Sequence, residues 1–318
     1  MIGRVVMILL AGIAGLILVA IIFGAARVQQ FEDNAPAIGE FVEVLGVKLH
    51  VVDIGPKESD LAPVVLIHGA SSNLRDMLIS LGESLSQERR VLIFDRPGHG
   101  YSARPDDGWK LDRQADLIYR AALARGAERP IIVGQSFGGA VALALGLQHQ
   151  AELAGLVLLA PVSHEWPGGV AWYNRAAGIP VIGGLLVRSV LPFYGPATID
   201  GSIKAAFAPL DPPENYVLRS GVKLLFRPRN FANNAEDLRF LKRQVIQQQH
   251  RYTELALPVM IVASDDDSTV STRLHAEALA REVQRADFVR LKTGGHPLQH
   301  TKTDIAVDMI KRLDGIER

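Results

Sequence analysis

Gly134-Gln135-Ser136-Phe137-Gly138 is the stretch of the sequence that decides the fold. It follows a short apolar run at residues 130–133 and precedes a run of small and apolar residues at 139–147. This order is typical of a strand, a sharp turn and a helix, the setting of a Gly-x-Ser-x-Gly nucleophile elbow. The glycines let the backbones of strand and helix approach closely. The pattern therefore predicts Ser136 as a nucleophile at the edge of a parallel sheet.

A serine hydroxyl needs a base that takes its proton, and the base needs a group that orients it. Residues 257–263 have the pattern of a buried strand, and three aspartates follow soon after it. A later strand at 288–291 leads into a glycine-containing loop that carries His296. Both loops follow the carboxyl ends of strands, so we expect them at the same sheet edge as Ser136. The aspartates that could orient the base are Asp265, Asp266 and Asp267.

Two further segments complete a resemblance to the α/β-hydrolase superfamily, specifically its capped branch of esterase-like and C–C-hydrolase-like enzymes. Residues 64–70 look like the family's strand and oxyanion turn, and residues 94–102 look like its next strand and loop. The resemblance covers residues 40–318. It implies an α/β fold with a mostly parallel central sheet flanked by helices, and a helical cap inserted at about 163–253.

The resemblance also implies a role for each candidate residue. Ser136 would be the nucleophile, and His296 would be the general base and later the general acid. Asp267 would orient the histidine, because the family often ends the acid strand in a Gly-x-x-Asp turn. Here Ser264 stands at the glycine position of that turn. The chain thus departs from the family's Gly-x-x-Asp pattern at the first position of the turn that carries Asp267.

The resemblance further implies an oxyanion hole made by the backbone N–H groups of Ala70 and Phe137. Three other histidines lie near these motifs. His300 is the rival base, and we expect it to face solvent or the cap. His68 and His99 sit in glycine turns, where we expect them to support loops by hydrogen bonding.

The sequence predicts no cofactor, no metal and no nucleic-acid partner. It contains no cysteine and no His-Glu-x-x-His zinc motif. It also lacks the glycine-rich fingerprints of dinucleotide and nucleoside triphosphate sites. The 34 Lys and Arg residues balance the 34 Asp and Glu residues, which argues against binding to a polyanion. No motif identifies a protein partner.

The amino-terminal segment is a second strong signal. Residues 5–26 contain no charge and consist mainly of Val, Ile, Leu and Ala. About 20 helical residues cross a hydrocarbon core of about 30 Å, so this run is long enough to span a bilayer. We predict a retained transmembrane anchor at 1–27, a polar linker at 28–39 and one hydrolase domain at 40–318. A signal peptide cleaved near 24–26 is the alternative.

The charges that flank the apolar run indicate which side of the membrane each end of it favours. Arg4 and the α-amine precede the run, and Arg27 follows it. The positive-inside rule slightly favours a cytoplasmic amino terminus, with the hydrolase domain on the periplasmic or extracytoplasmic side.

The segment between the Ser136 motif and the aspartates is rich in aromatic residues, which as a set predict a hydrophobic substrate pocket. We therefore predict a membrane-anchored serine hydrolase that cleaves a lipophilic carboxylic ester through an acyl-enzyme. A C–C bond hydrolase or a thioesterase would use the same triad, and a non-catalytic binding protein could keep the fold. The aromatic residues are Trp166, Trp172, Tyr173, Phe193, Tyr194, Phe207, Tyr216, Phe226 and Phe231.

Overall fold

The computed structural model of the chain describes residues 2–315, and its centre is one eight-stranded sheet. The strand order is β1-β2-β4-β3-β5-β6-β7-β8. β2 pairs antiparallel with β1 and β4, and all other pairs are parallel. The strands are β1 (Glu40–Val44), β2 (Val47–Ile54), β3 (Val64–Ile67), β4 (Val91–Phe94), β5 (Ile131–Gln135), β6 (Gly155–Leu159), β7 (Val259–Ser264) and β8 (Ala286–Leu291).

Helices cover both faces of the sheet, which explains why the central strands are continuous apolar runs. Successive side chains of β3 point to opposite faces: Val65 and Ile67 pack with α4 and α5, whereas Val64 and Leu66 pack with α2 and α13. The helices around the sheet are α2 (Leu74–Met77), η1 (Leu78–Gly82), α3 (Glu83–Leu85), α4 (Leu111–Ala124), α5 (Phe137–His149), η2 (Gln150–Glu152), α11 (Ala276–Glu282), α12 (Leu298–Thr301) and α13 (Thr303–Asp314).

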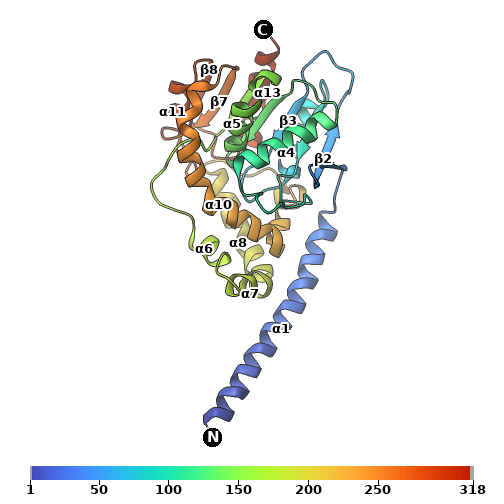
Figure 1. Cartoon of the computed structure of the whole chain (residues 1–318), viewed down its shortest axis with the longest axis vertical. Helices are drawn as coiled ribbons and strands as arrows, with labels where there is room; N and C mark the ends of the chain where they lie inside the picture. The colour runs from blue at the N-terminus through green and yellow to red at the C-terminus, as the bar shows by residue number, and fades with distance from the viewer. Residues whose placement is uncertain (1, 316–318) are drawn as a thin grey trace.

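A helical segment connects β6 to β7, and we call residues 160–258 the β6–β7 segment. It contains the stretch 163–253 that the sequence predicts as a cap. Its helices α6, α7 and α8 lie at the end of the body from which the amino-terminal helix projects (Figure 1). The helices are α6 (Trp172–Ala177), α7 (Ile182–Ser189), α8 (Leu191–Phe207), α9 (Tyr216–Arg219), η3 (Val222–Phe226), α10 (Pro228–Gln248) and η4 (Gln249–Glu254).

The amino-terminal helix α1 (Ile2–Asn34) is long and apolar enough to cross a membrane. Its most apolar 18-residue window has a mean hydropathy of 3.2, and none of that window is buried in the protein. Most of the helix extends away from the body, and the two chain termini lie at opposite ends of the molecule (Figure 1). These properties fit a membrane span and a signal sequence equally.

Helix α1 extends farther than the sequence analysis expected, because it continues to Asn34 through most of the predicted linker at 28–39. Its last turns dock on the β6–β7 segment. Phe31 is buried in a cluster with Phe226, and Glu32 pairs with Arg227 at 2.9 Å. These contacts stabilise helical structure in a stretch whose polar composition indicated a linker.

Candidate active site

Ser136 lies between β5 and α5 in a strained backbone conformation. Its φ is 54° and its ψ is −116°, a region that residues other than glycine seldom adopt. Three backbone hydrogen bonds hold the turn: Ser136 N–H donates to Leu159 O at 3.0 Å, and the N–H groups of Gly139 and Val162 donate to Ser136 O at 2.9 and 3.1 Å. A Cβ at Gly138 would lie 2.3 Å from Ile67 O, so only glycine lets α5 approach β3 this closely.

The three aspartates after β7 have different partners. Asp265 forms an exposed ion pair with Arg290. Asp266 accepts hydrogen bonds from the backbone N–H groups of Gly294 and Gly295, at 3.1 and 2.9 Å. Burial would raise the pKa of Asp266, but these donors and the Ser264 hydroxyl hold it below its ordinary value. Asp266 therefore fixes the backbone of the loop that carries the histidine.

Asp267 contacts the histidine ring itself. Its Oδ2 lies 2.7 Å from His296 Nδ1, and its Oδ1 accepts the backbone N–H groups of Thr269 and Val270. A carboxylate only accepts hydrogen bonds, so a proton is on Nδ1, and in the neutral ring Nε2 is the nitrogen that accepts. Nε2 lies 3.3 Å from the Gln135 side-chain nitrogen, a neighbour that the motif analysis did not identify.

Ser136 and His296 line one cavity of about 540 Å³, which Ala70 also lines. Among the described residues, the Ser136 hydroxyl makes no hydrogen bond to His296, whose Nε2 lies near Gln135 instead. Hydrogen bonds between catalytic groups are often long or absent before substrate binds. Within residues 2–315, no protein atom accepts a hydrogen bond from the backbone N–H of Ala70 or of Phe137. Of these two residues, Ala70 also lines the cavity.

The walls of this cavity come mainly from the β6–β7 segment. Leu186, Val190 and Ile199 line it together with all but two of the aromatic residues that the sequence analysis singled out. The exceptions are Trp166 and Phe193. Among the described lining residues there is no Lys or Arg. The cavity is thus suited to an apolar ligand and provides no cation for an anionic one.

A buried polar cluster beside the cavity was not predicted. The Asp76 carboxylate accepts hydrogen bonds from Tyr216 Oη at 2.6 Å, Gln299 Nε2 at 2.8 Å and His300 Nε2 at 2.8 Å. Burial would raise the pKa of Asp76, but His300 and these donors hold it below its ordinary value. Of the two expected positions for His300, solvent is wrong, since its side chain is only 3% exposed; it packs instead on Tyr216, within the stretch predicted as the cap. It contacts the β6–β7 segment through Tyr216 and does not orient toward Ser136 as a base.

Hydrogen bonds tie the β6–β7 segment to the loops that carry the candidate site residues. Ser71 N–H, next to the predicted oxyanion residue Ala70, donates to Asn234 Oδ1 at 2.7 Å. His296 N–H donates to Ala206 O at 3.0 Å. The partners in these pairs are far apart in sequence, so no motif could indicate them.

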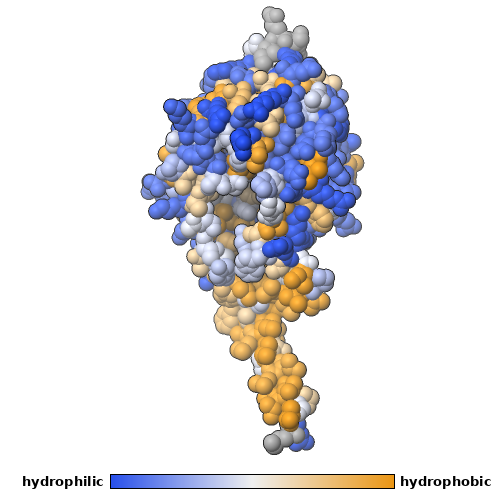
Figure 2. Space-filling view, turned by 90° about the vertical axis from the view of Figure 1, so that its left-hand side faces the viewer, coloured by the Kyte–Doolittle hydropathy of each residue, from blue (hydrophilic) through white to orange (hydrophobic). Residues whose placement is uncertain are grey.

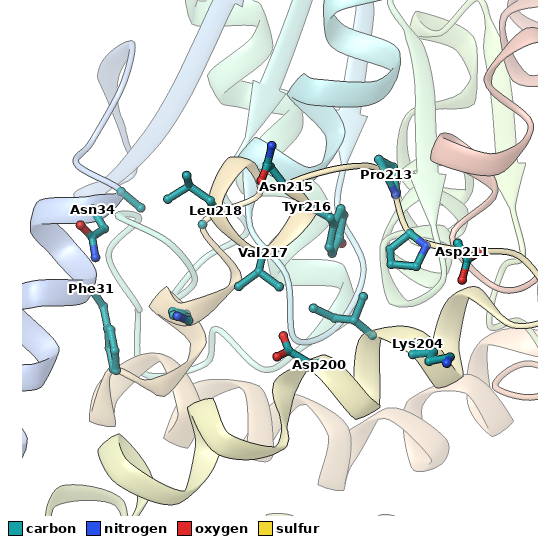
Figure 3. A pocket seen from close by; sticks show the side chains of 15 residues that line it. Phe31, Asn34, Asp200, Lys204, Asp211, Pro213, Asn215, Tyr216, Val217 and Leu218 are labelled. Carbon is teal, nitrogen blue, oxygen red and sulfur yellow. The ribbon is translucent and has the colours of Figure 1, made fainter.

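A second cavity, also of about 540 Å³, lies where the end of α1 meets α8 and the loop before α9 (Figure 3). Phe31 and Asn34 come from α1, Asp200 and Lys204 come from α8, and Tyr216 is shared with the first cavity. Its lining includes neither Ser136 nor His296. We therefore assign the candidate active site to the aromatic cavity.

The buried histidine His68 predicts sensitivity to acid. Burial, assisted by the charge of Arg96, lowers the pKa of His68 to about 4, and its Nε2 accepts Arg96 N–H. The unfolded chain binds this proton near pH 6.5, so it holds more protons than the folded protein between pH 6.5 and 4. The free energy of unfolding should therefore fall in this window, by about 1.4 kcal/mol per pH unit for such a group. Chemical unfolding of the detergent-solubilised protein at pH 7, 6 and 5 measures this slope.

A second histidine provides the control for the pH experiment. Burial lowers the pKa of His275 to about 4, and its Nδ1 accepts the N–H groups of Ser163 and His164. The substitution His275→Gln keeps an acceptor and removes the titration, so it should reduce the slope. Equal stability at pH 7 and pH 5 in the unchanged protein would contradict the prediction.

Comparisons with known proteins agree with this architecture. The profile of the Alpha/beta hydrolase family matches residues 64–306. A 2-hydroxymuconate semialdehyde hydrolase from Pseudomonas putida is 34% identical over 136 residues, which cover 42% of this chain and 47% of that protein. The chain thus spans about half the length of the two curated 2-hydroxymuconate semialdehyde hydrolases that it matches.

Solved structures share the fold at low sequence identity. A membrane phospholipase A described as a bacterial virulence factor has a TM-score of 0.69 at 20% identity, with 98% of this chain and 96% of that chain covered. The enol-lactonase from Burkholderia xenovorans LB400 has a TM-score of 0.68 at 17% identity, with 86% and 99% covered. The sheet, the flanking helices and the family match give one conclusion: this chain belongs to the Alpha/beta hydrolase family.

Proposed function

We propose that the protein is a membrane-anchored serine hydrolase that cleaves a lipophilic carboxylic ester. One observation carries the proposal: a serine on a positive-φ elbow shares an aromatic-lined cavity with a histidine whose Nδ1 lies 2.7 Å from a carboxylate. The nucleophile would be Ser136, the base His296 and the orienting acid Asp267. Hydrolase relatives support an enzymatic role.

The proposed mechanism uses the hydroxyl of Ser136, the Nε2 atom of His296 and two backbone N–H groups. Nε2 of His296 takes the proton as Ser136 Oγ attacks the ester carbonyl, and the oxyanion accepts the N–H groups of Ala70 and Phe137. His296 then gives the proton to the leaving alcohol as the C–O bond breaks. Water, deprotonated by the same nitrogen, releases the acid from the acyl-enzyme and restores Ser136.

C–C bond hydrolysis is the second candidate, because a curated C–C hydrolase shares 34% identity with part of this chain. A muconate carries a permanent negative charge, and a cationic side chain is the usual partner that offsets the cost of desolvating such a charge. The described lining has the Asp76 carboxylate and no Lys or Arg. This lining favours a neutral ester or thioester over an anionic substrate.

The proposed anchor is α1, with its apolar run at 5–26 in the bilayer. Arg4 and the α-amine before the run, against Arg27 after it, slightly favour the hydrolase domain on the extracytoplasmic side. In this arrangement the β6–β7 segment acts as a cap over Ser136 at the membrane end of the domain.

A fluorophosphonate probe tests the proposed function. The folded, detergent-solubilised protein should form a single adduct, which peptide mapping by mass spectrometry places on Ser136, because only an activated serine attacks the probe. The other serines in the same digest are the internal control. Hydrolysis of p-nitrophenyl esters should become faster as the acyl chain lengthens, since the cavity walls are apolar. A folded protein that forms no adduct would favour the non-catalytic binding protein.

A further inference from the structure

The β6–β7 segment exposes a large apolar surface at the end where α1 leaves the body. Single exposed apolar residues are ordinary, but a continuous patch of this kind marks an interaction site. Figure 2 shows that the apolar surface of α1 continues onto this end of the body. We call these residues the α6–α8 surface: Trp172, Tyr173, Ile179, Val181, Ile182, Leu185, Leu186, Val190, Phe193 and Tyr194, which are between 38% and 79% exposed.

Helix α1 packs against α7 and α8 along one stripe of its own surface. Ile17, Ile21, Gly24 and Val28 are partly or fully buried there at helical spacing. A Cβ at Gly24 would lie 2.7 Å from Arg188 O, so glycine permits this close approach. The α6–α8 surface is therefore fixed beside α1.

The position of this stripe along α1 determines how deep α7 and α8 would lie in a bilayer that α1 spans. The stripe begins at Ile17, well inside the apolar run at 5–26. Nine residues of helix separate Ile17 from the end of the run, a distance of about 14 Å. If the run crosses the hydrocarbon core, the helices packed on this part of α1 lie at the depth of one lipid leaflet.

The composition of the segment fits a lipid boundary. From Trp166 to Ile199 the sequence has no Asp or Glu, and its only charged residues are Arg175 and Arg188. Both arginines are exposed, which suits contact with anionic headgroups. Exposed Trp and Tyr side chains beside them are typical of the membrane interface.

We propose that the α6–α8 surface is inserted in the bilayer beside α1 and that the active-site cavity opens toward lipid; this inference rests on the proposed membrane anchoring and the proposed hydrolase site. The same side chains serve both surfaces: Trp172, Val190 and Tyr194 are exposed and also line the cavity of Ser136. A lipophilic ester dissolved in the membrane would reach Ser136 without crossing water.

Because the chain has no cysteine, spin labels on single introduced cysteines can test the insertion directly. The variants are Ile179→Cys and Ile182→Cys on the α6–α8 surface, Leu16→Cys on α1 and Leu123→Cys on α4 as a water-exposed control. These positions are 46%, 55%, 72% and 41% exposed, so labels should not disturb the fold. The full chain is reconstituted in vesicles of phosphatidylcholine and phosphatidylglycerol. Collision rates are then measured with oxygen, which concentrates in lipid, and with a water-soluble nickel chelate.

Insertion predicts that labels at 179, 182 and 16 collide mainly with oxygen, and that the label at 123 collides mainly with nickel. Nickel access at 179 and 182 equal to that at 123 would overturn the inference, and the label at 16 would then report whether the anchor fails with it. Labels at 179 and 182 shielded from both reagents, with dipolar broadening, would mean that a second copy of the chain covers the surface. That result would also overturn the inference.

A kinetic experiment tests the route of the substrate. Ile179→Glu with Ile182→Glu places two charges on the α6–α8 surface at positions that do not line the cavity. We expect at least a tenfold loss in hydrolysis of a long-chain ester held in vesicles, with hydrolysis of a soluble short-chain ester unchanged. Leu123→Glu is the matched control and should change neither rate. A double variant that hydrolyses the vesicle-held ester as fast as the unchanged protein does, or that loses both activities by the same factor, would contradict entry from lipid. Absence of both activities in the unchanged protein would instead contradict the proposed hydrolase function.

Discussion

Replacing Asp267 with asparagine should lower kcat for ester hydrolysis by roughly 10⁴-fold while the protein stays folded, the size that this change has in serine proteases. The backbone N–H groups of Thr269 and Val270 donate to Oδ1, so they would hold the asparagine carbonyl oxygen at that position. The amide nitrogen would then replace Oδ2, 2.7 Å from His296 Nδ1. It would donate to Nδ1 and force the ring proton onto Nε2, which then cannot accept the proton of Ser136.

The neighbouring aspartates provide matched controls for this prediction. Asp266→Asn should act mainly on stability, because Asp266 accepts hydrogen bonds from the backbone of Gly294 and Gly295. We expect a lower thermal unfolding temperature and a much smaller loss of kcat than in Asp267→Asn. Asp265→Asn removes an exposed ion pair and should change stability by less than about 1 kcal/mol. Steady-state rates and thermal unfolding of the three variants give the comparison. If Asp266→Asn lost activity and Asp267→Asn kept it, the acid would be Asp266.

The sequence motifs were most informative where one local signal determines both structure and chemistry. The apolar run, turn and small-residue helix around Ser136 predicted the strand and helix that enclose the positive-φ elbow. The apolar strands before the aspartates and before His296 likewise predicted two loops that meet at one sheet edge. The triad assignment itself stays a prediction until the variants are measured.

The sequence could not predict contacts that depend on tertiary packing. His300 faces Asp76, which lies 224 residues earlier in the chain, and Tyr216 completes the cluster from the β6–β7 segment. Nothing near His300 in sequence indicates a buried carboxylate. The helical end of α1 was missed for the same reason, because the partner of Glu32 is Arg227. The composition of a segment indicates the structure that it favours on its own. It does not indicate contacts that form only when elements distant in sequence pack together.

Arg96→Met should destabilise the protein by about 3–5 kcal/mol, because it breaks a fully buried charge network. Both side chains of the Arg96–Asp237 pair are 0% exposed, and their nitrogen and oxygen atoms are 2.8 Å apart. The same guanidinium donates to His68 O and Gly69 O and lies 4.1 Å from the centre of the Phe137 ring. Methionine fills similar volume, but it removes the side-chain donor to His68 O, one of the two donors to Gly69 O and the closest donor to Asp237 Oδ2. Thermal unfolding should show a fall in Tm of about 5–8 °C for a chain of this length.

A double variant separates the charge from the packing. Burial already raises the pKa of Asp237 despite two neighbouring arginines, so removal of Arg96 leaves a costly buried carboxylate. Adding Asp237→Leu to Arg96→Met removes that carboxylate and should recover part of the lost stability. Activity should not recover with it, because Arg96 also holds the Gly69 carbonyl beside the predicted oxyanion residue Ala70. A double variant with normal stability and normal kcat would mean that the loop keeps its position without the arginine, and Arg96 would then contribute through charge pairing alone.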